Sequence, residues 1–372
     1  MNSKKILGVI FANVHDEFVL NLTKNRSMAS IPFGGRYRMI DFTLSSLVNG
    51  GVATVGVVPK YNYHSLMNHL GSGKPWDLDR KNGGLFILPP YLNSGMSAKS
   101  GHIASLDAIM TYLTRSDEEY IILCDCDVVA NVDVKAMLKQ HQQTKADITI
   151  AYKKGNLPFN NGDVMTFDIG EDFKINKIRV PKQARKEVNF SLDTIIMKRS
   201  LLIKLVTQRI EKNSEHIWRD VFMPRVNSLN FCGFEVSSPV FMIDSELTYA
   251  KANFALLNPQ IRNSLFLKDR PVYTKVRDDV PAKYGPFSKV SNSLVADGCI
   301  IEGAVSNSVL FRGVKVEKGA VIKNSIIMQD TVVGENCDIN YVISDKNVHF
   351  GKETQLKGAA THYMYINKSA VL

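Results

Sequence analysis

A short repeat of branched apolar residues near the end of the chain restricts the possible folds more than any other feature. These residues return every five to six positions from Val295 to Ile339 and once more at Val348, with glycines and asparagines between them: Val295, Ile300, Val305, Leu310, Val316, Ile322, Ile327, Val333, Ile339 and Val348. So short a period predicts a parallel β-helix, whose coils bury their apolar faces only by stacking on one another. A β-sandwich of short strands is the alternative, which the regular glycine spacing disfavours.

The first two thirds of the chain alternate between strand and helix patterns. Predicted strands at 5–12, 52–60, 83–91, 120–129 and 146–154 are separated by predicted helices at 41–51, 61–73, 101–119 and 132–145. This alternation predicts an α/β domain with a mostly parallel, Rossmann-like sheet covered on both faces. Ligands of such sheets bind at the carboxyl ends of the strands, which here are 11–18 and 125–131.

The pattern changes after about residue 161. A hairpin is predicted over 163–180, turned at Gly170 and Glu171, and a further strand over 190–198. A helical pattern over 245–258 precedes an irregular stretch that contains prolines. The predicted organisation is therefore a first domain at 1–257, a linker at 258–286 and a β-helix domain at 287–372.

Composition excludes several classes of protein. The net charge is +10, but the lysines and arginines are dispersed and no nucleic-acid motif is present, so anionic small molecules or an acidic partner are the expected ligands. No apolar run approaches the roughly 20 residues that span a bilayer, so no membrane association is expected. Five scattered cysteines favour reduced thiols and a cytoplasmic location, with Cys124 and Cys126 buried in a strand.

Three segments together resemble one known family. They read PFGGRYRMIDFTLSSLVNGG at 32–51, GSGKPWDLDRKNGGLFILPPY at 71–91 and NSLVADGCIIEGAVSNSVLF at 292–311. The chain resembles the ADP-glucose pyrophosphorylase (glucose-1-phosphate adenylyltransferase) family essentially from end to end. This resemblance implies a nucleotidyltransferase domain followed by a left-handed parallel β-helix. It also implies the chemistry that joins glucose 1-phosphate to the adenylyl part of ATP and releases pyrophosphate, in glycogen or starch synthesis.

The phosphate-binding loop of that family is not preserved. Its glycines fall on Asn13, Val14 and Asp16, its arginine on Phe18 and its lysine on Met28. Backbone amides can cradle a triphosphate only where no side chain intervenes. Asp16 and its neighbour Glu17 are also expected to add negative charge there, which reverses a Coulomb contribution of roughly 4 kcal/mol per close pair.

The remaining catalytic positions are partly lost. Asp127 matches a metal-binding aspartate of the family, whereas the sugar-site lysine falls on Pro181 and the second metal aspartate on Met242. Lys182 and Asp244 are the nearest substitutes. No catalytic set is intact, and Asp127, Lys182 and Asp244 are vestigial candidates. Mg²⁺ is expected only if residual catalysis exists, with Asp127 as its ligand, and no other cofactor is expected.

Nucleotidyl transfer depends on cations and Mg²⁺ that neutralise phosphate charge, so the isolated chain is predicted to be inactive or nearly so. It resembles the non-catalytic, regulatory subunits of the family. That implies a hetero-oligomer, expected to be a tetramer, with a catalytic subunit, and a homo-oligomer when alone. Two alternatives are a weakly active pyrophosphorylase and a stand-alone protein that binds sugar phosphate or nucleotide.

Two arginines in the motif GGRYR form a candidate anion site. Arg36 and Arg38 correspond to a basic region that binds phosphorylated effectors in the family, and the planar guanidinium suits phosphate. The alternative is a pair of surface arginines on a turn. His15, His64 and His69 show no metal-binding spacing and are interpreted as structural.

Overall fold

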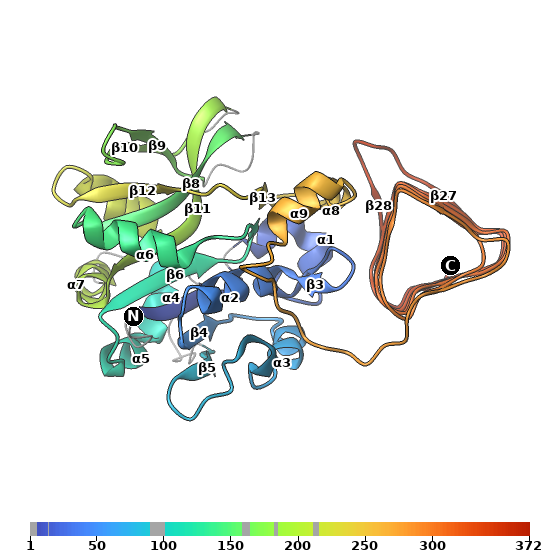
Figure 1. Ribbon diagram of the computed structural model, residues 1–372, viewed down its shortest axis with the longest axis horizontal. Coiled ribbons are helices and arrows are strands. Elements are labelled where there is room, and N and C mark those ends of the chain that lie inside the picture. Colours follow the sequence, from blue (N-terminus) through green and yellow to red (C-terminus); the bar gives the residue numbers. More distant parts are fainter. Residues whose placement is uncertain (1–5, 14, 90–100, 158–163, 182–184, 211–215) are drawn as a thin grey trace.

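The computed structural model describes residues 6–13, 15–89, 101–157, 164–181, 185–210 and 216–372. A layered α/β domain lies beside a β-helix of triangular cross-section, with the helices α1, α8 and α9 at their junction (Figure 1). Among the described residues, no helix is both long enough and apolar enough to cross a bilayer. The predicted architecture, an α/β domain with a mostly parallel sheet followed by a parallel β-helix, is confirmed.

A nine-stranded sheet forms the centre of the first domain. Its central strands β6 (Tyr120–Asp125), β1 (Ile6–Phe11), β4 (Thr54–Val58) and β5 (Gly84–Ile87) run parallel and side by side. The long strand β11 (Arg185–Lys198) pairs antiparallel with β6, β8 (Ile148–Leu157) and β9 (Thr166–Ile169). β12 (Phe231–Glu235) runs parallel to β8, and β10 (Ile175–Arg179) closes the predicted hairpin with β9.

Helices cover both faces of this sheet because the buried strands are apolar on both sides. One face packs against α2 (Met39–Asn49), α3 (His64–Leu70) and α6 (Val134–Gln143). The other packs against α4 (His102–Ala108), α5 (Met110–Arg115) and α7 (Arg199–Ile210). Cys124 and Cys126 both lie in the first of these cores, as their spacing in a strand predicts.

Three five-stranded parallel sheets build the β-helix. The first contains β14 (Lys283–Tyr284), β17 (Ile300–Ile301), β20 (Lys315–Val316), β23 (Val332–Val333) and β26 (His349–Phe350). The second contains β15 (Lys289–Ser291), β18 (Ala304–Ser306), β21 (Val321–Lys323), β24 (Asp338–Asn340) and β27 (Gln355–Lys357). The third contains β16 (Leu294–Val295), β19 (Val309–Leu310), β22 (Ile326–Ile327), β25 (Val342–Ser344) and β28 (Met364–Ile366).

The inward residues of these coils are those that the repeat predicts, with one exception. Val305, Ile322 and Ile339 stack in register through consecutive coils and are buried. Ile300 was expected inside, but its side chain is 39% exposed and the adjacent Ile301 fills the core instead. Successive residues of a strand face opposite sides. The sequence therefore does not determine which of two adjacent isoleucines points into the core.

The segment expected to be a linker, 258–286, contains regular structure at both ends. Helix α9 (Pro259–Leu265) buries Leu265 at the junction, and β14 already pairs with β17 of the next coil. The stretch at 266–282 connects the two. A shared apolar core joins the domains, in which Leu22 and Phe33 of the first domain lie in one cluster with Phe311 and Ile326 of the β-helix.

Candidate functional site

The carboxyl ends of β1 and β6 bring the two predicted ligand-binding segments together. These strands are parallel neighbours, with Phe11 opposite Asp125. The residues that follow each strand therefore lie side by side at one edge of the sheet. β11 pairs with β6 on its other side and adds Asp193, whose backbone is left-handed with φ of 46°.

Four side chains converge at this edge. Ligand atoms of His15, Asp125, Asp127 and Asp193 all lie within 4.8 Å of one another. The Nε2 atom of His15 is 3.5 Å from Asp125 and 3.8 Å from Asp127. On the opposite side, Nε2 of the buried His102 lies 3.0 Å from both carboxylate oxygens of Asp125. His15 was interpreted as structural from its spacing alone, which did not reveal the carboxylates that β6 and β11 bring beside it.

Burial and proximity shift the pKa values of this cluster in different directions. Burial alone would lower the pKa of His15, but the neighbouring Asp127 and Asp125 raise it to about 10. Burial, reinforced by Asp125 and Asp127, raises the pKa of Asp193 to about 8. Burial also opposes ionisation of Asp125, yet His102 and His15 hold its pKa well below the usual range. At neutral pH the cluster therefore contains a protonated His15 beside an ionised Asp125.

Phe18 completes the enclosure of His15. The two rings stack with centroids 5.2 Å apart and an interplanar angle of 17°. Together with Asp127, Asp193, Met242 and Asp244, they line a cavity of about 10 Å³. That volume suits about one water molecule. The cavity that these described residues line is therefore too small for a triphosphate.

The carboxyl group of Asp16 serves a different purpose from the one expected. It was predicted to add negative charge to the phosphate position, but it is buried and accepts hydrogen bonds from Asn13 Nδ2 at 2.6 Å and from the Met28 amide at 2.8 Å. Burial raises its pKa to about 6. Asp16 therefore holds the loop together from within, while Glu17 is exposed. Val14, another position of the lost phosphate loop, lies outside the described residues.

The vestigial candidates are only partly brought together. Asp127 and Asp244 line the same cavity. However, Oδ1 of Asp244 accepts hydrogen bonds from Thr248 Oγ1 at 2.9 Å and from Ser245 Oγ at 3.3 Å, at the start of α8 (Glu246–Ala255). Lys182 lies outside the described residues.

The cluster does not fit the Mg²⁺ that the family chemistry implies. Mg²⁺ requires near-octahedral oxygen coordination and usually retains several waters. Here the imidazole of His15 lies against two of the three carboxylates, in a cavity with room for about one water. The histidine ring takes the space that a hydrated cation would need.

The candidate anion site lies where the first domain meets the β-helix. Gly34 and Gly35 turn the chain with φ of 59° and 83°, and a side chain at Gly34 would approach Leu256 to 2.9 Å. Arg36 is exposed, and its guanidinium carbon lies 5.8 Å from the ring centroid of Tyr37. Arg38 is half-buried, and its Nη1 donates to both Ser65 O and Ser65 Oγ at 2.8 Å. The two arginines therefore have different surroundings.

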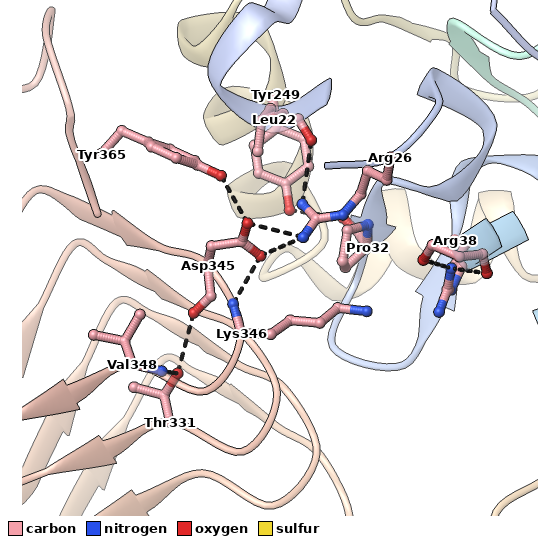
Figure 2. Close-up of polar contacts among 11 residues, drawn as sticks. Leu22, Arg26, Pro32, Arg38, Tyr249, Thr331, Asp345, Lys346, Val348 and Tyr365 are labelled. Carbon is pink, nitrogen blue, oxygen red and sulfur yellow. Dashed lines mark hydrogen bonds and ion pairs between the residues drawn. The ribbon is translucent and has the colours of Figure 1, made fainter. Parts of the chain in front are cut away.

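A buried ion pair beside them joins the two domains (Figure 2). Arg26 Nη2 lies 2.6 Å and 2.8 Å from the carboxylate oxygens of Asp345, which follows β25. Tyr365 also donates to Asp345 at 3.1 Å. The side chain of Lys346 extends toward the loop of Arg38, and burial, together with Arg38 and Arg26, lowers its pKa to about 7. No motif in the sequence pointed to Arg26, Asp345 or Lys346.

Comparisons with known proteins agree with this architecture. Residues 19–183 match the Nucleotidyl transferase family, and residues 280–360 match the GlmU-like, C-terminal hexapeptide family. The glycogen biosynthesis protein GlgD of Bacillus subtilis (strain 168) is 37% identical over 372 residues, covering 100% of this chain and 98% of that protein. GlgD of Geobacillus stearothermophilus is 37% identical over 321 residues, or 86% and 83% of the two chains. The glucose-1-phosphate adenylyltransferase of Clostridium perfringens (strain SM101 / Type A) is 31% identical over 341 residues, or 90% and 87%.

Proposed function

Because the chain belongs to the family formed by the GlgD proteins and the glucose-1-phosphate adenylyltransferases, we propose that it acts in glycogen biosynthesis as a regulatory, non-catalytic subunit. It assembles with a catalytic paralogue and modulates that subunit's synthesis of ADP-glucose. A phosphorylated small molecule acts on the assembly through the anion site at the domain junction.

One observation carries this proposal. His15 and Phe18 belong to the segment that matches the family's phosphate loop, their rings stack on one another, and the cavity that they line measures about 10 Å³. Transfer of a nucleotidyl group needs its phosphates positioned and their charge neutralised. The protonated His15 at this place already lies beside the ionised Asp125, so the cluster offers no free positive charge to a polyanion. The fold is retained because its surfaces still serve assembly.

An assay of the purified chain, alone and mixed with a catalytic paralogue, tests the proposal. With ATP, glucose 1-phosphate and Mg²⁺, the isolated chain is expected to form negligible ADP-glucose, whereas the mixture is expected to differ from the catalytic subunit alone in activity or effector response. Turnover by the isolated chain that Asp127→Ala abolishes would make it a weak pyrophosphorylase. Tight nucleotide binding without turnover and without a partner would make it a stand-alone binding protein.

The first coil of the β-helix supplies a surface for assembly. Tyr284 and Phe287 are 51% and 86% exposed, Ile300 of the adjoining second coil is 39% exposed, and β14 leaves one edge open to a further strand. Exposed apolar side chains and open strand edges favour contact with another chain. Light scattering during the same assay is expected to give an oligomer for the chain alone and a new hetero-oligomer, such as a tetramer, on mixing. Monomer alone and no shift on mixing would contradict the assembly.

Arg36 is the stronger candidate for contact with an effector. Its side chain is exposed, whereas the guanidinium of Arg38 is already bound to Ser65. A charge-assisted hydrogen bond contributes about 1.5–3 kcal/mol. Arg36→Ala in the mixed complex is therefore expected to raise the half-saturating effector concentration about tenfold or more, with assembly unchanged. Arg219→Ala, which changes an exposed arginine elsewhere, is the matched control. Equal effector titrations for Arg36→Ala, Arg38→Ala and the unaltered chain would show that neither arginine contacts the effector.

A further inference from the structure

The carboxylates of Asp125, Asp127 and Asp193 form a buried group that requires a positive partner. Their side chains belong to residues only 5%, 7% and 5% exposed, and with His15 their ligand atoms lie within 4.8 Å of one another. Carboxyl groups so close together and so far from water repel one another unless a cation or a proton lies between them. In this chain the side chain at that place is His15, which approaches both Asp125 and Asp127.

The three carboxylates are not equally satisfied. Asp125 is held by His102 at 3.0 Å, and Asp193 accepts a hydrogen bond from Ser191 Oγ at 2.9 Å. By contrast, Oδ1 of Asp127 is buried and has no hydrogen-bond partner among the described residues. Such an orphaned oxygen costs free energy. It lines the same small cavity as His15 and is available as a ligand.

We propose that the ring of His15 is a built-in substitute for a divalent cation, and that its removal opens a cation site formed by Asp125, Asp127 and Asp193. The ring excludes the metal by occupying its space and by meeting the same carboxylates. Once the ring is absent, three carboxyl groups face a space left by an imidazole. Oxygen ligands of this kind suit hard divalent cations such as Mn²⁺ or Mg²⁺.

In this arrangement the loop lacks the family's phosphate-binding residues but carries His15. The positive charge of His15 reduces the repulsion between the buried carboxylates. Phe18 stacks on the outer face of His15 and holds the ring in place. Asp16 fixes the same loop through the Met28 amide. The inference concerns cation occupancy in this chain and stands whether or not the chain regulates a catalytic paralogue.

Titration of the protein with Mn²⁺, monitored by calorimetry and by the electron paramagnetic resonance signal of free Mn²⁺, tests the inference. The unaltered chain is expected to bind Mn²⁺ weakly at this site or not at all. His15→Ala is expected to bind one additional Mn²⁺ at least tenfold more tightly, and Mn²⁺ is expected to raise its Tm. Asp127→Asn added to His15→Ala should remove that gain. His64→Ala, which removes a histidine from α3, is the matched control and should behave like the unaltered chain.

Several outcomes would overturn the inference. Equally tight binding of Mn²⁺ by the unaltered chain would show that His15 does not exclude the metal. If His15→Ala and His15→Asn both fold but gain no Mn²⁺ binding, the carboxylates form no latent cation site. The same conclusion holds if both variants unfold and Mn²⁺ does not refold them. The readout is metal binding, so these results are independent of the activity assay with a catalytic paralogue.

Discussion

Asp345→Ala is expected to lower the free energy of unfolding by about 3–5 kcal/mol, the cost of removing one partner of a buried ion pair. Asp345 is 1% exposed and Arg26 is 2% exposed, and the two form a bidentate contact across the domain junction. Without the carboxylate, Arg26 loses both contacts to Asp345 and still experiences the nearby positive charge of Lys346. Denaturant unfolding followed by circular dichroism measures the loss.

A second pair in the same β-helix is the control for this experiment. Asp338 and Lys357 lie 3.0 Å apart, but their side chains are 38% and 61% exposed. Asp338→Ala is therefore expected to cost less than about 1 kcal/mol, because solvent screens exposed pairs. Asp345→Leu combined with Arg26→Met should recover much of the stability, since replacing a buried pair with apolar groups is often neutral. Equal losses for Asp345→Ala and Asp338→Ala would contradict a structural role for the junction pair.

Gly303→Ala is expected to destabilise the β-helix by about 3 kcal/mol, at the upper end of typical overpacking costs. A Cβ atom at Gly303 would lie 2.3 Å from Ala320 O and 2.8 Å from Glu317 O. The first of these oxygens accepts the hydrogen bond from the Ala304 amide that ties two coils together. Backbone atoms cannot rotate away as a flexible side chain can, so the coils must separate locally. Thermal unfolding measures the effect.

Gly155→Ala provides the comparison. A Cβ atom there would meet only Phe190 Cε1, at 3.9 Å, which is ordinary contact distance. The change is expected to alter stability by less than about 0.5 kcal/mol, as do most substitutions away from such constraints. If Gly303→Ala unfolded at the same temperature as the unaltered protein, the close stacking of the coils at Ala320 would be refuted.

Local patterns predicted most of the fold. The apolar repeat indicated the β-helix because its period depends only on residues close in the chain. The alternation of strands and helices likewise predicted the parallel strands β6, β1, β4 and β5 and both layers of helices. The wrong prediction that Ile300 faces the core also comes from relying on a local pattern. Ile300 and Ile301 satisfy the repeat equally well, and only the path of the coil places Ile301 inside.

The candidate site was predicted in position but not in chemistry. The ends of β1 and β6 were expected to meet, and Asp127 was expected there. Asp193 reaches the same place because β11 runs antiparallel beside β6, which strand patterns do not reveal. The carboxyl of Asp16 was expected to add negative charge at the phosphate position, but it is buried within the loop, where it accepts hydrogen bonds from Asn13 Nδ2 and the Met28 amide.

The sequence by itself determined the two domains, the course of the coils and the loss of the family's phosphate-binding residues, because these depend on residue type and on spacing between near neighbours. Only the tertiary structure decided which charges meet. Arg26 and Asp345 are 319 positions apart, and His15 meets its carboxylate partners only where its own loop, the end of β6 and strand β11 converge. Electrostatic and hydrogen-bonding energies depend on distance and burial in space, and neither quantity is encoded in a local pattern.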